Sequence, residues 1–469
     1  MASDRAKRNV LLASALGSSL APFMVSALIV ALPTIGREFS ADVTSLGLLT
    51  STFFIAAAIF LVPFGKVADT YGVKKVFTLG VAVYFIAALL CVFSPDLSIL
   101  TLARALTGIG AAMIFGTSIA LVSLVFPESE RGKAIGINVA AMSLGFLMGF
   151  LLGGILTFYS GWRTLFLLTL PVEILVFWLV VTRLKGECEL LRRREPDIPG
   201  MVVYGLAILF IMTGTSLLPQ RTGSAILGAG ILCLPVLALW ELRVGSPLIE
   251  LRALAKNRQY LIANLVVIIF NTTNFAVIFL ASLFLQDIKG YDPRFAGLIL
   301  LATVVFMVLL SPVAGKLSDR THPAYVIGSG IILSSAGLGI FAFVDTITSF
   351  PVIIIALSLV GAGIAFSQSP LVRTAVSSVP REMYGFAAGM IETMRLLGMT
   401  ISISIAGIVF ALTTGGLPGI TPRVPTFIEA FHTSFRLYLA ISLIVLILVM
   451  TLHRYVLPEK PGKVPEKGN

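Results

Sequence analysis

The chain alternates long apolar runs with short segments that gather charged and turn-forming residues. Most runs reach the roughly 20 residues that an α-helix needs to cross about 30 Å of hydrocarbon with its backbone hydrogen bonds satisfied internally. The alternation typical of a β-barrel is absent. The pattern predicts an all-α membrane protein with fourteen spans, near residues 11–35, 46–65, 76–94, 98–126, 134–158, 164–183, 199–218, 223–241, 260–285, 295–315, 324–344, 350–372, 384–413 and 434–457.

Composition supports this prediction and narrows the function. Only 12% of the residues are charged and 57% are hydrophobic, against roughly 25% and 45–50% in soluble domains. No loop is long enough for a soluble catalytic domain, and no Gly-Lys pair is followed by Ser or Thr as in an ATPase phosphate loop. We therefore expect no enzyme activity. The energy for any transport is expected to come from an ion gradient or from the substrate's own gradient. The three cysteines, Cys91, Cys188 and Cys233, lack metal-like spacing, so neither a metal, a disulfide nor a cofactor is expected.

The distribution of Lys and Arg predicts the orientation in the membrane. The termini and the even-numbered loops hold 24 of these 34 residues, and the opposite loops hold 7. By the positive-inside rule, both termini are expected on the cytoplasmic side. The net charge of +11 is then a matter of topology and of attraction to anionic lipid, with no nucleic-acid partner. The first span is interpreted as a retained helix, because its apolar run is longer than that of a signal peptide.

A short repeat predicts two related halves. The segment Gly65-Lys66-Val67-Ala68-Asp69 recurs as Gly315-Lys316-Leu317-Ser318-Asp319, and each copy is expected in a charged loop. Two similar halves place a substrate site at their interface, which a rocking motion opens to either side. The predicted division is an N-terminal six-helix bundle at 1–183, linkers with two inserted helices at 184–258, a C-terminal six-helix bundle at 259–457, and a cytoplasmic tail at 458–469.

Several motifs resemble one transporter family. The stretch Gly65-Lys-Val-Ala-Asp69-Thr-Tyr-Gly72-Val-Lys74-Lys75 resembles the cytoplasmic signature of the major facilitator superfamily. The segment Arg104-Ala-Leu-Thr-Gly108-Ile-Gly110-Ala-Ala112 is similar to the superfamily's fourth-span pattern, with Thr107 in place of Gln. The fifth span has the glycine spacing of the antiporter motif, with Phe150 where that motif has Pro; its glycines are Gly136, Gly145, Gly149, Gly153 and Gly154.

With the inserted pair of spans, the whole chain resembles the fourteen-span drug:proton antiporter branch. Gly161-Trp162-Arg163 and Arg395-Leu-Leu-Gly398 are similar to that branch as well. The resemblance implies the major facilitator fold, a multi-pass monomer in the plasma membrane, and exchange of a small-molecule substrate for protons. It also implies a latch in which Asp69 faces Arg131 and the start of the thirteenth span, with Asp319 as the weaker copy. A solvated loop charge is the alternative interpretation of Asp69.

One departure concerns the coupling acid. In the first span, Met24 stands where the branch has an acidic residue, so another group must carry any coupled proton. Glu392 and Arg395 are three residues apart on one helical face and form the leading candidate. A structural ion pair or a cytoplasmic gate is the alternative. Arg104 is expected either to tune a carboxylate or contact substrate, or to bond to backbone carbonyls. Glu173 is expected to mark a lipid-side kink or a lateral opening.

The ninth span supplies the predicted wall of the substrate cavity. Asn264, Asn271 and Asn274 are spaced by seven and three residues, which places the three amides on one helical face. Hydrogen bonding between helices is the alternative. Gln368 is expected to extend this wall. Met24 and Met113 are candidates for soft apolar contacts with substrate, against the alternative that they only pack.

The predicted function is proton-coupled efflux of hydrophobic or amphipathic compounds by alternating access. A lipid or lipid-linked substrate exporter is the first alternative, since an apolar cavity and a membrane-facing Glu173 suit an acyl chain. A uniporter or importer is the second alternative, because the first-span acid and the motif proline are missing. A membrane sensor or scaffold is the third.

Overall fold

The computed structural model describes residues 4–183, 197–218, 220–245, 247–248, 257–379, 383–414 and 424–451. Within these ranges the chain forms fourteen helices that are long and apolar enough to cross a membrane, as predicted, and no strand. A π-helical turn, η1 (Phe284–Ile288), continues α10. The fourteen helices are α1 (Asp4–Phe39), α2 (Val43–Tyr71), α3 (Val73–Val92), α4 (Leu97–Val125), α5 (Glu128–Ser160), α6 (Arg163–Arg183), α7 (Ile198–Ser216), α8 (Arg221–Glu241), α10 (Arg258–Leu283), α11 (Pro293–Arg320), α12 (Pro323–Phe341), α13 (Phe350–Ser377), α14 (Tyr384–Thr414) and α15 (Val424–Thr451).

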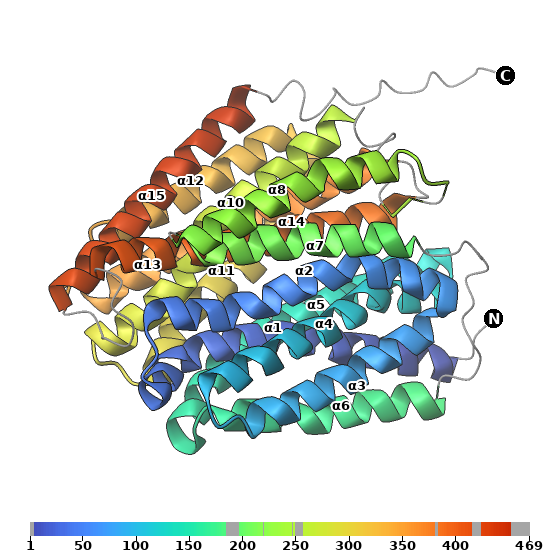
Figure 1. The fold of residues 1–469 in the computed structure, drawn as a ribbon, viewed down its shortest axis with the longest axis horizontal. Helices are drawn as coiled ribbons and strands as arrows, with labels where there is room; N and C mark the ends of the chain where they lie inside the picture. Colours follow the sequence, from blue (N-terminus) through green and yellow to red (C-terminus); the bar gives the residue numbers. More distant parts are fainter. Residues whose placement is uncertain are drawn as a thin grey trace.

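Helices α1–α6 and α10–α15 form two sets with the same internal packing, here called the N bundle and the C bundle (Figure 1). In the N bundle α1 packs on α5 and α6, α4 packs on α2 and α3, and α3 packs on α6. The same five pairings recur in the C bundle when each helix number is raised by nine. The bundles meet along two matching seams, α2 with α14 and α5 with α11. The short sequence repeat therefore belongs to a repeat of whole bundles.

The end of the molecule where α1 begins beside α5 is called the terminal face. There Lys7 Nζ lies 2.7 Å from Glu130 Oε2. The opposite end, called the far face, holds the turn between α1 and α2. There Asp42 and Asp96 accept hydrogen bonds from the backbone N–H groups of Ser45 and Ile99, each at 2.9 Å. These caps satisfy the first orphan donors of α2 and α4.

The repeated pentapeptide is helical, so the predicted loop placement is wrong. Residues 65–69 form the last turns of α2, and residues 315–319 form the last turns of α11. Both helices extend beyond their apolar runs. A helix can continue past the membrane surface because its backbone hydrogen bonds form within the helix and do not require apolar side chains. Helix α2 ends at Gly72, whose φ of +106° suits glycine and strains other residues. The N–H of Gly72 still donates to Ala68 O at 3.0 Å.

The inserted helices α7 and α8 pair with each other and cover one seam (Figure 1). Helix α7 packs on both α2 and α14. Tyr204 Oη donates to Ala58 O of the N bundle at 3.2 Å and lies 3.5 Å from Thr393 Oγ1 of the C bundle. Ser216 Oγ meets Ser404 Oγ of α14 at 3.1 Å. The insert therefore bridges the two bundles along the α2–α14 seam.

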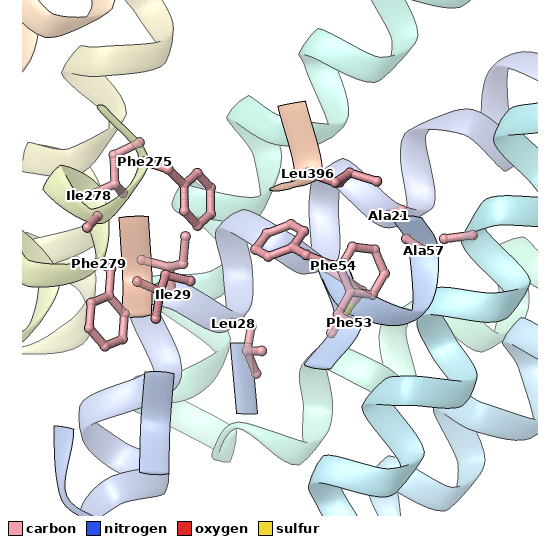
Figure 2. Packing of buried hydrophobic residues seen from close by; sticks show 14 of the residues in the cluster. Ala21, Leu28, Ile29, Phe53, Phe54, Ala57, Phe275, Ile278, Phe279 and Leu396 are labelled. Carbon is pink, nitrogen blue, oxygen red and sulfur yellow. The ribbon is translucent and has the colours of Figure 1, made fainter. Parts of the chain in front are cut away.

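Buried apolar residues from both bundles meet in the middle of the molecule (Figure 2). Phe54 of α2 lies edge-on to Phe275 of α10, with 5.0 Å between the ring centroids. Ile29 of α1 and Phe279 of α10 are both fully buried. The central contact between the bundles is therefore apolar and well packed over this stretch.

Candidate functional site

Two polar side chains of the C bundle bind backbone carbonyls of α1 at the far face. Ser282 Oγ donates to Ile29 O at 2.7 Å, and Gln286 Nε2 donates to Val30 O at 2.8 Å. Pro33 lies four residues after Ile29 and has no N–H, so it leaves the Ile29 carbonyl without its helical donor. The other bundle supplies the missing donor. These two hydrogen bonds, the far-face clamp, join the bundles.

Glycines allow the α5–α11 seam to close at the same face. A Cβ atom on Gly154 of α5 would lie 2.5 Å from Pro293 O, and one on Gly297 of α11 would lie 2.5 Å from Phe150 O. Both distances are too short for a side chain. The motif glycines Gly145, Gly149 and Gly153 instead pack against α1. A Cβ on Gly145 would collide with Ser19, one on Gly149 with Ser26 and Phe23, and one on Gly153 with Ala27. The predicted motif thus divides between packing within the N bundle and packing between the bundles.

Arg294 connects the bundles beside this glycine seam. Its Nη1 donates to Tyr159 Oη at 2.8 Å, and its guanidinium lies 3.6 Å from the centroid of the Phe158 ring. Its Nη2 also donates to Asp292 Oδ2 at 3.0 Å. Hydrogen bonding from Arg294 lowers the pKa of the Asp292 carboxyl below its ordinary value. The far-face seam therefore combines close backbone packing with a charged hydrogen-bond network.

The glycines toward the opposite ends of α5 and α11 lie in open space. A Cβ atom added to Gly136 of α5 or to Gly315 of α11 would meet nothing within 4 Å. The α2–α14 seam, in contrast, is close along its length: a Cβ on Gly47 would lie 2.9 Å from Ile403, and one on Gly389 would lie 3.9 Å from Val62. The α5–α11 seam is therefore tight toward the far face and open-spaced toward the terminal face.

Four of the predicted functional residues line one small cavity in the C bundle. Asn271, Gln368, Glu392 and Arg395 come from α10, α13 and α14, and the cavity has a volume of about 40 Å³. Gln368 Nε2 donates to Asn271 Oδ1 at 2.9 Å, and Arg395 Nε donates to Glu392 Oε1 at 3.1 Å. By helical rise, Glu392 lies about 12 Å from the start of α14. The cavity accommodates a water molecule and is too small for a drug-sized compound.

The Glu392–Arg395 pair is partly accessible. The side chains are 30% and 31% exposed, which is high for charged groups so deep in a membrane-spanning helix. Charged residues at this depth face protein or water rather than lipid. The pair is therefore accessible, whereas the other charged candidates inside the spans, Arg104 and Glu173, are buried.

The other amides of α10 point to different partners. Asn274 Oδ1 accepts a hydrogen bond from Ser334 of α12, and its Nδ2 donates to Phe270 O at 2.8 Å. Asn264 Nδ2 donates to Tyr260 O at 2.8 Å, while its Oδ1 is buried without a partner among the described residues. Only Asn271 of the three lines the cavity. The contact of Asn274 with Ser334 fits the alternative interpretation of the three amides, which is hydrogen bonding between helices.

The two methionine candidates are packing residues in this conformation. Met24 is fully buried. Met113 faces α3, where a Cβ on Gly80 would lie 2.6 Å from the Met113 Cβ. Neither lines the C-bundle cavity. A role for them in substrate contact stays a prediction.

Arg104 and Glu173 lie inside the N bundle. Arg104 is 1% exposed, and its guanidinium lies 4.6 Å from the centroid of the Phe53 ring. Glu173 is 0% exposed. The interpretation of Glu173 as a membrane-facing residue is therefore wrong, because α6 turns this side chain inward, onto a face packed by α1 and α3. The argument that Glu173 favours an acyl chain loses its support.

The predicted latch residues lie at the terminal face. Asp69 is exposed in the last turn of α2, and Lys74 and Lys75 open α3. Arg131 is half-buried near the start of α5, and its Nε has no hydrogen-bond partner among the described residues. The side chain of Asp319 and the residues just before α14 lie outside the described part of the chain. The latch stays a prediction.

A larger depression lies elsewhere. It has a volume of about 580 Å³ and is formed by α15 and the turn between α12 and α13, with Asp345, Glu429, His432 and Arg436 among its lining residues. It contains none of the predicted site residues. Its size suits a ligand, but its chemistry does not match the motifs, so the seams and the C-bundle cavity remain the candidate site.

The family follows from these features together with sequence comparison. The sequence model of the Major Facilitator Superfamily matches residues 14–403. The chain belongs to this family. Its members are membrane transporters rather than enzymes, and the chain is accordingly a multi-pass transporter of small molecules.

Individual relatives and one solved structure refine this assignment. The multidrug resistance protein Stp of Mycobacterium tuberculosis is 30% identical over 87% of this chain and 76% of its own length. The riboflavin transporter RibZ of Clostridioides difficile is 26% identical over 94% of this chain and 96% of its own. The drug efflux pump JefA of M. tuberculosis is 27% identical over 87% and 81%. The nucleoside transporter NupG has the same fold, with a TM-score of 0.65 at 15% identity, over 95% of this chain and 99% of that one.

Sequence reasoning missed the residues that join the bundles. Ser282, Gln286, Arg294 and Tyr204 are not among the predicted site residues. Arg294 contributes only to the loop charge, and the other three are uncharged side chains whose spacing forms no motif. Pro33 was the available signal, since a proline within a span leaves one carbonyl without its donor. The identity of the donor depends on which helix lies opposite, and that is a tertiary property.

Proposed function

We propose that this transporter exports hydrophobic or amphipathic compounds in exchange for protons, by alternating access in the plasma membrane. The carrying observation is the uneven α5–α11 seam, tight between Gly154 and Pro293 and open-spaced at Gly136 and Gly315. A seam that is tight at one end and open-spaced at the other suits a rocking cycle in which the bundles pivot on each other. If the basic termini are cytoplasmic, this conformation opens toward the cytoplasm.

Drug efflux is favoured over other substrates by the relatives and by the apolar contact between the bundles. Stp and JefA are described as a multidrug resistance protein and a drug efflux pump. The central contact between the bundles is apolar and aromatic, with Phe54 and Phe275 at 5.0 Å. These rings offer large apolar surfaces to a substrate when the bundles move apart. The polar edge at Asn271 and Gln368, with the accessible Glu392–Arg395 pair, provides a few oriented hydrogen bonds and charges.

The riboflavin transporter RibZ supports a second candidate. It matches this chain over a larger share of both lengths than Stp does. The paired amides of Asn271 and Gln368 offer both donors and acceptors, which suits a flat heterocycle with amide-like edges. A flavin-like solute moved without proton exchange is therefore the alternative to drug efflux.

The experiment uses the full chain in proteoliposomes that contain a pH-sensitive dye. Ethidium and riboflavin serve as fluorescent probes, each supplied as an outward or inward gradient. Drug:proton antiport predicts that ethidium movement drives proton movement in the opposite direction. Riboflavin flux without pH change favours the second candidate, and movement of neither probe contradicts both.

The variant Glu392→Gln tests the cavity in the same assay. It leaves Arg395 without its carboxylate partner and adds a net positive charge beside Asn271, so uptake of cationic ethidium is expected to need a higher concentration. The matched control is Glu429→Gln, which removes an exposed acid on α15. An identical concentration dependence for both variants contradicts the assignment of Glu392 to the substrate site.

A further inference from the structure

The side of α5 that faces α11 is buried at one end and uncovered at the other. Toward the far face, Phe150 and Gly154 are buried, and the Phe150 carbonyl lies 2.5 Å from where a Cβ on Gly297 would be. Whole helical turns lead back along the same side to Val139 and Gly136, about three turns before Phe150 and five before Gly154. Val139 is 52% exposed, and Gly136 is exposed as well.

Helix α11 shows the same change on its side of the seam. Gly297 is buried against α5. On the same side of α11, Val308 follows about three turns later and Gly315 about five turns later. Val308 is 36% exposed, and a Cβ on Gly315 would meet nothing within 4 Å. Gly136, Val139, Val308 and Gly315 are here called the exposed seam strip.

The exposed seam strip spans about one leaflet of a membrane. Lys316 is exposed at its terminal-face end, and a lysine near the end of a membrane helix reaches for the polar surface. By helical rise, Val308 lies about 12 Å deeper than Lys316 and Val304 about 18 Å deeper. Val304 is on the same side of α11 and is fully buried. The exposure therefore ends near 15 Å, which is about half of the roughly 30 Å hydrocarbon core.

The second seam between the bundles is closed within the same leaflet. Val62 of α2 lies about 14 Å from the terminal-face end of its helix, and a Cβ on Gly389 of α14 would lie 3.9 Å from it. Val62 is only 7% exposed. Helix α7 packs on both α2 and α14, and a Cβ on Gly205 of α7 would lie 3.3 Å from Ile59. The inserted helices thus seal one seam, whereas the α5–α11 seam is uncovered.

The exposed seam strip is apolar. Helix α5 carries no ionisable side chain from residue 134 to residue 158, and α11 carries none from 297 to 315. A charged or strongly hydrated group would find no partner along this path, and its transfer from water would cost several kcal/mol. An aromatic or aliphatic body loses nothing there, because it moves from lipid to an equally apolar surface.

We infer that substrate enters this transporter laterally, from the leaflet at the terminal face, by passing between α5 and α11 along the exposed seam strip. The α7–α8 insert keeps the α2–α14 seam closed, so entry from lipid is one-sided. The substrates are compounds with an apolar body that dissolves in the leaflet and a polar group that stays at the membrane surface. The inference rests on the proposed export by alternating access and adds the route and the property that selects the substrate.

The first measurement asks what occupies the exposed seam strip. Val139→Cys and Leu144→Cys are each labelled with bimane in the full chain without native cysteines, in phosphatidylcholine bilayers with brominated or ordinary acyl chains. Leu144 is exposed on the same helix but lies off the seam side. Bromine is expected to quench both labels. Tetraphenylphosphonium, a non-fluorescent cation that partitions into membranes, is expected to relieve the quenching at Val139 alone.

The second measurement asks whether the strip is the route. Val308→Trp and its neighbour Leu309→Trp are compared in proteoliposomes, with tetraphenylphosphonium transport followed by an ion-selective electrode. Both side chains are exposed, so neither substitution disturbs packing within a bundle, but Leu309 lies off the seam side. Val308→Trp is expected to lower transport to the level of protein-free liposomes. Leu309→Trp is expected to keep the wild-type rate.

The outcomes separate the inference from the proposed function. If the wild-type chain transports tetraphenylphosphonium but the Val139 label is not quenched, or responds to the cation no more than the Leu144 label, lateral entry is overturned and export stands. Equal transport by the two tryptophan variants has the same meaning. A tryptophan that only blocks closure of the bundles would leave the Val139 label unresponsive to the cation. A wild-type chain that moves neither tetraphenylphosphonium nor ethidium contradicts the proposed function and the route together.

Discussion

Ser282 of the C bundle donates a hydrogen bond of 2.7 Å to the carbonyl of Ile29 in the N bundle. Pro33 leaves this carbonyl without a donor from its own helix. The bond therefore satisfies a backbone group that would otherwise be unpaired in the membrane. A proline and a serine that are far apart in the sequence together define where the bundles are held.

Removing this bond is expected to favour opening at the far face. Side-chain hydrogen bonds between membrane helices contribute about 0.6 kcal/mol on average, so Ser282→Ala should shift the ratio of open to closed states roughly threefold. Adding Gln286→Ala should increase the shift. The measurement is the distance distribution between spin labels at Phe93 and Ile347, which are 76% and 87% exposed at the far face, in a background without native cysteines.

The control for this experiment is Ser335→Ala. Ser335 Oγ meets Ser442 Oγ at 2.8 Å within the C bundle, so its loss removes a similar hydrogen bond without touching the seam. An equal change in the label distances for Ser282→Ala and Ser335→Ala would show that the clamp does not hold the bundles.

Gly154→Ala is expected to force the α5–α11 seam apart. The added Cβ would lie 2.5 Å from Pro293 O, a backbone atom that cannot move alone. Overpacking of this kind typically costs about 1–3 kcal/mol, and here the bundles relieve it by separating. The same label pair should report longer far-face distances.

The matched substitution Gly136→Ala lies on the same helix in open space. It should leave the distances unchanged and stabilise the helix by about 0.5–1 kcal/mol through its backbone entropy. Longer distances in this variant would mean that glycine content, rather than the seam contact, sets the separation.

Gly72→Ala is expected to destabilise the junction between α2 and α3. The φ of +106° at this position strains a residue with a Cβ by about 1–3 kcal/mol. Gly65→Ala is the control, because Gly65 lies in helical α2 and an added Cβ meets nothing within 4 Å. Thermal unfolding in detergent should show a lower midpoint for Gly72→Ala alone. Equal midpoints would contradict the conformational argument.

Asn271→Ala and Asn274→Ala should separate binding from stability. In the proposed cycle, the small cavity that Asn271 shares with Gln368 and Glu392 widens to admit substrate. The loss of Asn271 should then weaken ethidium binding by the value of one hydrogen bond, about 0.5–1.5 kcal/mol, or roughly two- to tenfold. Asn274 is 3% exposed and bonds within the C bundle, so its loss should lower the unfolding midpoint instead. Ethidium fluorescence titration and thermal unfolding measure the two effects. The reverse pattern would place the substrate against Asn274.

The spans, their number and the family motifs were predictable because each depends on local composition. An apolar run of about 20 residues can satisfy its backbone in lipid only as a helix, so the fourteen helices follow without knowledge of their neighbours. The helical ends of α2 and α11 were missed because hydropathy marks the membrane, whereas hydrogen bonding and Gly72 mark the end of the helix.

The candidate site was predictable only in part. Glu392 and Arg395 share a helical face by their spacing, and the structure confirms that they bond. The same rule grouped Asn271 with Asn274, which face different helices. Helical spacing places side chains on a face to within a broad arc, and the neighbouring helices decide which part of that arc is the cavity wall.

The sequence by itself determined the membrane class, the number of crossings and the repeat of two halves, because hydrophobicity, charge and motif spacing act along the chain. Only the tertiary structure decided that Glu173 faces the bundle interior, that Ser282 meets Ile29, and that α7 bridges α2 and α14. Those facts depend on which helix faces which, and in a membrane that choice is made by close packing and hydrogen bonds between residues distant in sequence, because lipid is as apolar as the helices themselves.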